Sequence, residues 1–299
     1  MISTTQVTAL TVLAMLAFAG NSLLCRMALA HTGIDAASFT SIRLVSGALT
    51  LGLIVALRDR AGARPVATAG PAGNWPSAFA LFAYAAAFSF AYLSLTAATG
   101  ALLLFGAVQT TMIGWGLWSG ERLRGPQAAG LVVALGGLVG LLLPGLSAPP
   151  LLGAGLMLAA GVAWGAYSLR GKSGGKGHAG SDPTRVTAGN FLRSMAFTAV
   201  LSLAMLPQAS LDSAGMGYAV ASGALASGLG YAVWYTALRG LQAASAATVQ
   251  LSVPVIAALG GTVLLSEPLT LRLLLCSAAI LGGIALVIAR PQRSEAAKS

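Results

Sequence analysis

Apolar residues fill this chain in long runs that are separated by short polar or proline-containing breaks. Each run is close to the ~20 residues that an α-helix needs to cross the hydrocarbon core of a bilayer. The runs lack the ten-residue alternation of outer-membrane barrel strands, so helices are the expected spanning element. The pattern predicts an all-α integral membrane protein with ten transmembrane helices. The expected spans cover about residues 6–30, 36–57, 76–96, 99–118, 126–143, 150–170, 185–206, 215–238, 243–264 and 268–289.

The composition agrees with the apolar pattern and removes several classes of protein. Of the 299 residues, 57% are hydrophobic and 8% are charged, and the mean hydropathy is +0.83, well outside the range of water-soluble domains. The first run has no basic segment ahead of it and is longer than a signal-peptide core, so we expect a retained helix. Only Cys25 and Cys276 are present, both inside apolar runs, which excludes a disulfide framework and a cysteine-based zinc site. No cofactor and no metal are expected.

The net charge of +10 is best interpreted through the placement of the basic residues. With the N-terminus in the cytoplasm, most lysines and arginines fall in loops on that side and in the C-terminal tail. The positive-inside rule therefore predicts that both termini are cytoplasmic. The charge is a topology signal, and no nucleic-acid partner is expected.

Two stretches of the chain repeat each other at an offset of 146 residues. "SGERLRGPQAAGLVVALGG" and "LSEPLTLRLLLCSAAILGG" pair Glu121 with Glu267, and Gly136-Gly137 with Gly282-Gly283. We expect each glutamate to lie at the positive end of the helix that follows it. The ten expected spans divide into two halves of five, with the boundary near residue 145, and because five is odd, the second half must be inverted in the membrane. Inverted repeats are typical of transporters in which a midplane site opens alternately to either side.

These stretches, together with "ASAATVQLSVPVIAALGGTVLLSE" before the second, resemble the paired EamA-type domains of the drug/metabolite transporter superfamily. The resemblance implies one repeat over residues 1–145, an inverted repeat over 146–289, and a cytoplasmic tail at 290–299. It also implies a multi-pass transporter of the bacterial inner (plasma) membrane that exports amino acids or other small metabolites. A central cavity walled by helices 1, 3, 4, 6, 8 and 9 is implied as well.

Candidate substrate-binding residues are the polar and aromatic groups inside the spans, because polar groups in hydrocarbon usually face a cavity or a partner helix. Their alternative roles are interfacial anchoring for the rings and interhelical hydrogen bonding for the amides. Pro254 joins them because it leaves a backbone carbonyl free four residues earlier. The candidates are Asn21, Tyr84, Phe88, Tyr92, Gln109, Trp164, Tyr167, Tyr231, Trp234, Tyr235, Gln250 and Pro254.

The charged residues inside the spans are few. Arg43 and Arg193 are candidates for binding a substrate carboxylate. The resemblance implies, however, that helices 2 and 7 are peripheral, which favours an anchoring role. All seven acidic residues lie at span ends, in loops or in the tail, so no midplane carboxylate is left for a proton relay. Weak or absent proton coupling is expected, as in a facilitator.

The sequence favours a transporter over the other classes considered. An intramembrane enzyme would need a nucleophile with a buried histidine, paired midplane aspartates or a metal cluster, and none is present. An ion channel is disfavoured because no charged ring is found in the spans. The expected partners are the lipid bilayer and a small molecule, with aromatic and other apolar amino acids first and lipophilic drugs or organic cations as the alternative.

Overall fold

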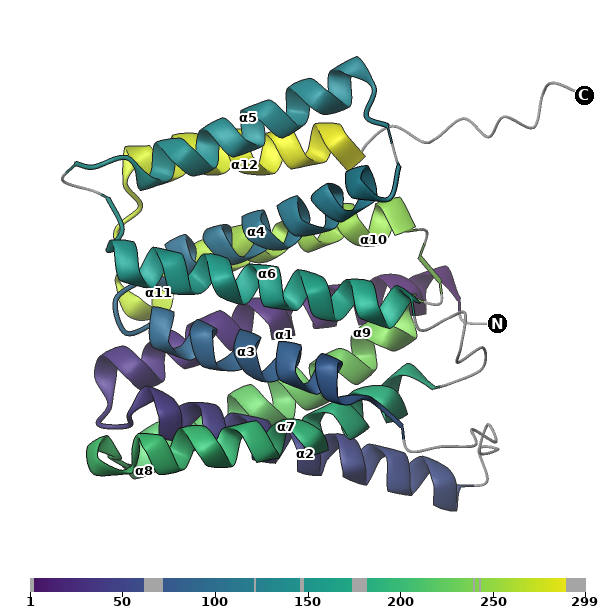
Figure 1. Ribbon diagram of the computed structural model, residues 1–299, viewed down its shortest axis with the longest axis vertical. Helices are drawn as coiled ribbons and strands as arrows, with labels where there is room; N and C mark the ends of the chain where they lie inside the picture. The colour runs from purple at the N-terminus through teal and green to yellow at the C-terminus, as the bar shows by residue number, and fades with distance from the viewer. Residues whose placement is uncertain are drawn as a thin grey trace, which may run out of the picture.

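The computed structural model describes residues 3–61, 72–120, 122–145, 148–173, 182–238, 240–241 and 243–288, and all regular secondary structure among them is helical. The first half contains α1 (Thr4–His31), α2 (Ala36–Arg60), α3 (Trp75–Ala91), α4 (Ala97–Trp118) and α5 (Gly125–Leu142). The second contains α6 (Leu151–Ser173), α7 (Pro183–Ala204), η2 (Leu206–Gln208), α8 (Ser213–Ala221), η3 (Ser222–Leu229), α9 (Gly230–Leu238), α10 (Ala243–Gln250), α11 (Ser252–Leu265) and α12 (Leu271–Ile288). In Figure 1 the helices lie nearly parallel in one bundle, with α5 and α12 together at one edge.

The helices have the length and surface of membrane spans. Within the described residues, seven helices are long and apolar enough to cross a bilayer. Large apolar side chains such as Leu152 and Val263 are 79% exposed on the outside of the bundle, where lipid rather than water would suit them. The protein is therefore a multi-pass integral membrane protein.

Two of the expected spans are interrupted in the structure. The span predicted at 215–238 is made of α8, the π-helical segment η3, and α9, which follow one another along the chain without a gap. The span predicted at 243–264 is divided at Leu251, between α10 and α11. The division falls where Pro254, having no backbone N–H, cannot bond the carbonyl of Gln250.

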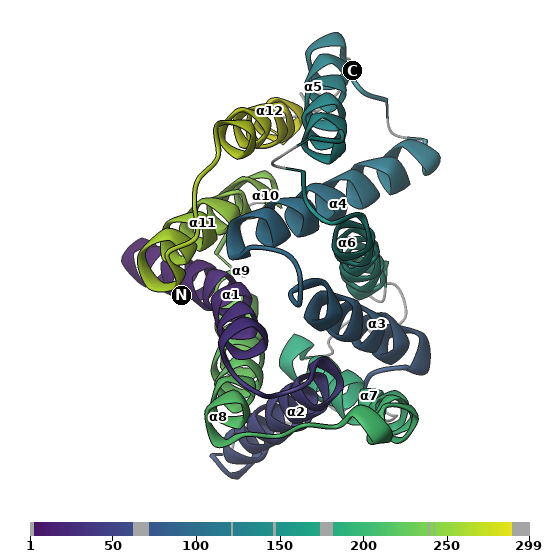
Figure 2. The same cartoon turned by 90° about the vertical axis from the view of Figure 1, so that its left-hand side faces the viewer.

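The packing of the helices has a regular plan. α5 packs on α12, α2 on α7, and α4 on α11, so that helices in equivalent positions of the two halves meet. Some of the other contacts occur in matching pairs: α3 on α6 corresponds to α9 on α1, and α4 on α6 corresponds to α11 on α1. Figure 2 shows α5 with α12 at one edge of the bundle and α2, α7 and α8 at the other.

The repeated Gly-Gly pairs lie where α5 meets α12. The second glycine of each pair, Gly137 or Gly283, is buried, and the first is exposed. A Cβ on Gly283 would lie 2.6 Å from the backbone nitrogen of Ala134, and one on Gly137 would lie 3.1 Å from that of Ile280. Ala134 and Ile280 are also 146 residues apart. The contact of Gly137 with Ile280 is therefore the counterpart, in the repeat, of the contact of Gly283 with Ala134. Small residues at such a crossing let two membrane helices approach closely.

We expect Gly283→Leu to destabilise the protein by about 1–3 kcal/mol, because the new side chain meets rigid backbone and forces α5 and α12 apart. The measurement is the midpoint of thermal unfolding of purified protein in detergent. Gly282→Leu is the matched control, since a Cβ there has no other atom within 4 Å. Equal midpoints for the two variants would show that the close approach is not what holds this pair of helices together.

Glu267 does not cap α12, which corrects the expectation from the sequence. α12 begins only at Leu271, where the hydroxyl of Thr270 accepts a hydrogen bond from the amide of Leu273. Glu267 instead accepts a 2.8 Å hydrogen bond from the amide of Ala97 at the start of α4, and it forms a 3.0 Å ion pair with Arg26 of α1. The equivalent Glu121 lies outside the described residues. Glu267 does lie at a helix N-terminus, as the sequence predicted, but the helix is α4 and not α12.

A second carboxylate joins the two halves at the turn before α2. Asp35 accepts hydrogen bonds from the amides of Ala37 and Ser38, and also from the amide of Ser210 that precedes α8. Although partial burial alone would raise it, these hydrogen bonds lower the pKa of Asp35 from its ordinary value. The stability that Asp35 contributes is therefore present above its unfolded pKa and is lost only as the pH falls through the lower, folded pKa.

Candidate functional site

A cavity lies inside the bundle between the two halves of the chain. It is walled by residues of α1, α3 and α4 from the first half, and of α6, η3, α9 and α10 from the second. The lining residues are Phe18, Asn21, Ser22, Tyr84, Phe88, Leu104, Phe105, Trp164, Ala226, Tyr231 and Gln250. Its volume in this conformation is about 30 Å³, which is room for a water or two rather than an amino acid. A larger ligand therefore requires the walls to move.

Aromatic rings form the largest part of the cavity wall. Trp164 is at the centre of the group, with its ring centroid 4.9 Å from that of Tyr84, 5.2 Å from Tyr231 and 5.4 Å from Tyr167. Phe88 adds a further ring, 5.4 Å from Tyr84. Rings at these distances interact favourably and would also stack on an aromatic or apolar ligand.

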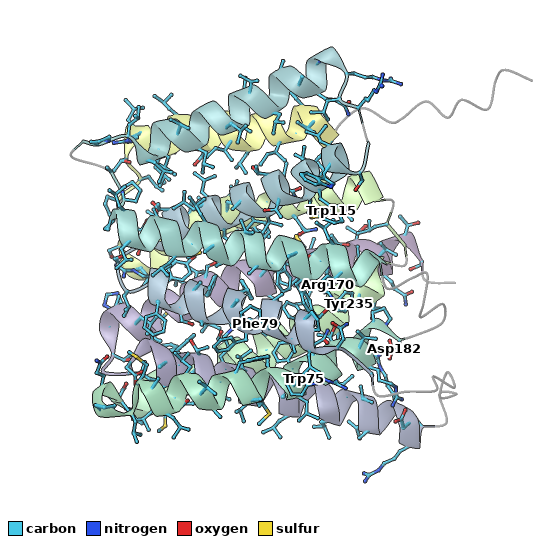
Figure 3. The ribbon with its side chains drawn as sticks, viewed as in Figure 1. Trp75, Phe79, Trp115, Arg170, Asp182 and Tyr235 are labelled. Carbon is cyan, nitrogen blue, oxygen red and sulfur yellow. The ribbon has the colours of Figure 1, made fainter. Side chains whose placement is uncertain are left out.

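Six of the residues expected from the sequence line this cavity, and they come from five different helices: Asn21, Tyr84, Phe88, Trp164, Tyr231 and Gln250. The other six lie elsewhere. The hydroxyl of Tyr92 donates to the carbonyl of Ala97, and that of Tyr167 to Thr187, both inside the protein. Trp234 packs edge-on against Phe18, and Gln109 and Pro254 are buried outside the wall. Figure 3 shows Tyr235 toward the same end of the bundle as Arg170 and Asp182.

A buried polar network continues behind the aromatic wall. Asn21 donates a 3.3 Å hydrogen bond to the hydroxyl of Tyr84 and accepts a 2.6 Å hydrogen bond from Ser222. Arg43 of α2 donates from Nη2 to the same tyrosine at 3.0 Å and from Nε to Ser227 at 3.4 Å. Arg43 is only 1% exposed, so the network places a full positive charge inside the protein next to the cavity.

The π-helical segment η3 supplies both serines of this network. In an α-helix, residues five apart point in different directions, because each residue turns by about 100°. The i→i+5 register of a π-helix instead brings Ser222 and Ser227 to one side, and likewise Gly223 and Gly228. Gly223 lies against the backbone of Arg43, and Gly228 lies against Thr50, so both glycines let η3 approach α2. The sequence carries this register as two Ser-Gly pairs five residues apart in "SGALASGL".

The two intramembrane arginines differ in what they contact. Arg193 is half-buried on α7 and donates to the backbone carbonyls of Ala72 and Gly189, as an anchoring residue would. Arg43 contacts no backbone carbonyl through its guanidinium in the hydrogen bonds found, and the helix that carries it packs on η3. The expectation that both arginines anchor peripheral helices therefore fits the contacts of Arg193 and does not fit those of Arg43.

Several residues of the site gave no signal in the sequence. Phe18, Leu104 and Phe105 are apolar residues in apolar helices, and hydropathy does not separate a cavity face from a lipid face. Ser22 and Ala226 are small residues that are frequent at any helix crossing. The repeated Ser-Gly pair is the one pattern that would have pointed to η3.

An internal, aromatic-lined cavity between helices suits the binding of a small molecule. Residues 151–289 match the EamA-like transporter family. The second half of the chain therefore carries an EamA-like transporter domain.

Known proteins resemble the chain over different extents. It is 60% identical over 290 residues to the uncharacterized protein PA1977 of Pseudomonas aeruginosa, covering 97% of this chain and 96% of that one. An uncharacterized transporter of Archaeoglobus fulgidus is 29% identical over 172 residues, covering 56% of this chain and 59% of its own. A crystal structure with 20% identity superposes with a TM-score of 0.65 and covers 95% of this chain and 98% of that chain, so the two share a fold.

Proposed function

We propose that the protein is an alternating-access exporter of small metabolites in the bacterial inner membrane, with aromatic and other apolar amino acids as its substrates. The cavity carries this proposal, because it combines stacked rings with hydrogen-bonding amides at the boundary between the two halves. The rings suit an apolar side chain, and Asn21 and Gln250 suit the polar end of an amino acid.

The alternating mechanism is supported by the helix packing. We take the chain to cross the membrane ten times, as two inverted repeats over 1–145 and 146–289 with a tail at 290–299. α8, η3 and α9 then form one crossing, and α10 and α11 form another. The exchange of contacts between α5 and α12 under the 146-residue offset is the behaviour of two units related by a pseudo-twofold axis. The start of α1 and the end of α12 lie at one end of the bundle, which suits cytoplasmic termini.

Transport is proposed to follow the substrate gradient without strong coupling to protons. Within the described part of the chain, the carboxylates of Asp35, Asp59, Asp182, Asp212 and Glu267 all lie outside the cavity wall. Glu267, the acidic residue that bonds α1 and α4, is held by Arg26. Among the described residues, the cavity wall therefore contains no carboxylate that would exchange a proton during transport.

Export of lipophilic drugs or organic cations is the alternative. The aromatic wall suits such molecules as well, since ring faces attract cations. The buried positive charge of Arg43 beside Tyr84 and Phe88 opposes a cationic ligand, because like charges repel strongly away from water.

The proposal is tested by uptake into proteoliposomes that contain the purified full-length protein. We expect labelled phenylalanine, tyrosine and leucine to enter faster than glutamate or lysine, and faster than into empty liposomes. Initial rates should be the same with and without a proton gradient at a fixed substrate gradient. A steep dependence on the proton gradient would refute the facilitator, and movement of a cationic dye without any amino acid would favour the drug exporter.

A further inference from the structure

We propose that Arg43 binds the carboxylate of the transported molecule, and that the site requires a carboxylate but not an ammonium group. The inference rests on the transport function proposed above and defines the substrate by its carboxylate. The ligands would be apolar and aromatic monocarboxylates, of which amino acids are only one kind.

In the part of the chain that the structure describes, no carboxylate forms an ion pair with Arg43. The ion pairs among the described residues are Arg26 with Glu267, Arg58 with Asp182, and Arg185 with Asp59, and none involves Arg43. A buried charge without an opposite charge is costly, and an ionisable side chain inside a membrane protein usually serves transport or binding. The carboxylate that would offset this cost must therefore come from a ligand.

The guanidinium of Arg43 also has bonding capacity to spare. Nε and Nη2 donate to the hydroxyls of Ser227 and Tyr84, whereas Nη1 is buried and has no hydrogen-bond partner among the described residues. A guanidinium binds a carboxylate best through two parallel hydrogen bonds. Nη1 would supply one of them, and Nη2 would supply the other once the hydroxyl of Tyr84 moves aside.

Two rings lie against the guanidinium of Arg43 and also line the cavity. The carbon at the centre of the guanidinium lies 5.2 Å from the ring centroid of Tyr84 and 4.9 Å from that of Phe88, and both rings line the cavity. The cavity must widen before it holds a substrate, and turning the ring of Tyr84 both widens it and uncovers Arg43. Tyr84 would then act as the cover of the carboxylate site.

The ammonium group of an amino acid finds no equivalent partner. Of the residues that the structure describes, those that line the cavity include no carboxylate, and the side-chain oxygens of Asn21 and Gln250 carry no charge. An ammonium would meet ring faces and neutral oxygens at best, and the charge of Arg43 would repel it. An acid that lacks the ammonium should therefore bind about as well as the amino acid, and an amine that lacks the carboxylate should not bind.

The test measures ligand binding to the purified full-length protein in detergent at neutral pH. The readout of binding is the rise in the thermal unfolding midpoint with ligand concentration. The probes are phenylalanine, 3-phenylpropanoate and 2-phenylethylamine, which share one ring. We expect the first two to raise the midpoint and the amine to leave it unchanged. Arg43→Gln should weaken the binding of both acids by about 10- to 100-fold, the range for a lost hydrogen bond to a charged group.

Arg193→Gln is the matched control, because it removes the other intramembrane arginine and should leave binding unchanged. Equal binding of amine and acid, no binding of either acid, or full affinity in Arg43→Gln would each overturn the inference. Should Arg43→Gln fail to fold, the comparison of acid and amine binding to the unaltered protein still tests whether the site requires a carboxylate. Acid binding without transport into liposomes would reject the proposed function and leave Arg43 as a carboxylate-binding residue, whereas amino-acid transport with amine binding would retain the proposed function and reject the role of Arg43.

Discussion

Replacing Trp164 with alanine should lower transport efficiency, kcat/KM for phenylalanine uptake, by about 10- to 100-fold, since each ring contact contributes about 0.5–1.5 kcal/mol beyond buried area. Trp164 contacts three other rings of the group, Tyr84, Tyr167 and Tyr231, with centroids within 5.4 Å. Its removal takes away a stacking surface for the substrate and also the side chain that holds Tyr84 and Tyr231 in place. Initial uptake rates over a range of substrate concentrations, normalised to reconstituted protein, provide the measurement.

The chain offers a close control for this variant. Trp115 of α4 is 54% exposed and is absent from the cavity lining, so Trp115→Ala removes the same side chain from a lipid-facing position. We expect Trp115→Ala to transport normally and Trp164→Phe, which keeps a ring, to fall between the two. Equal losses of transport in Trp115→Ala and Trp164→Ala would mean that the effect comes from folding or insertion. The cavity would then not be supported as the transport site.

The sequence was informative where a feature depends on composition or on repetition. Apolar runs of membrane length predicted helices, and the EamA-like transporter match over 151–289 supports the family resemblance seen in the sequence. The Gly-Gly pairs were visible as a repeat, but which glycine of each pair is buried depends on how α5 rotates against α12. That rotation follows from packing between segments about 146 residues apart, which periodicity within either segment does not report.

The site was predictable only in part, for a related reason. Trp164, Tyr84 and Tyr231 stand out as aromatic residues on inner helices, so residue type alone pointed to them. Arg43 was assigned to a peripheral helix by resemblance, yet its side chain is long enough to reach from α2 to Tyr84. Its importance depends on η3, whose π register turns Ser227 toward it, and a local change of helix register is not seen by a search for α-helical periodicity.

Removing the carboxylate of Glu267 should be the most destabilising single change outside the cavity. Its ion pair with Arg26 is largely buried, with 11% and 19% of the two side chains exposed, and breaking such a pair leaves an uncompensated charge. Glu267 also accepts the amide of Ala97 at the start of α4, while Arg26 donates to the carbonyl of Tyr92 after α3. The pair thus holds α1, α3 and α4 of the first half to the turn before α12. We expect Glu267→Ala to lower the free energy of unfolding by about 2–4 kcal/mol, somewhat below the full range for a buried pair because water still reaches both groups.

A double-mutant cycle separates the ion pair from other effects of these substitutions. Arg26→Leu and Glu267→Leu should each destabilise the protein, measured by reversible denaturation in mixed micelles, and the double variant should be less destabilised than the sum of the two. The reason is that removing both partners leaves no unpaired charge, whereas removing one leaves the other in a low-dielectric site. Strict additivity would show that Arg26 and Glu267 act separately, with Glu267 serving mainly to bond the amide at the start of α4. Strong coupling would instead identify the pair as the contact that closes the two halves together at the end of the bundle opposite the termini.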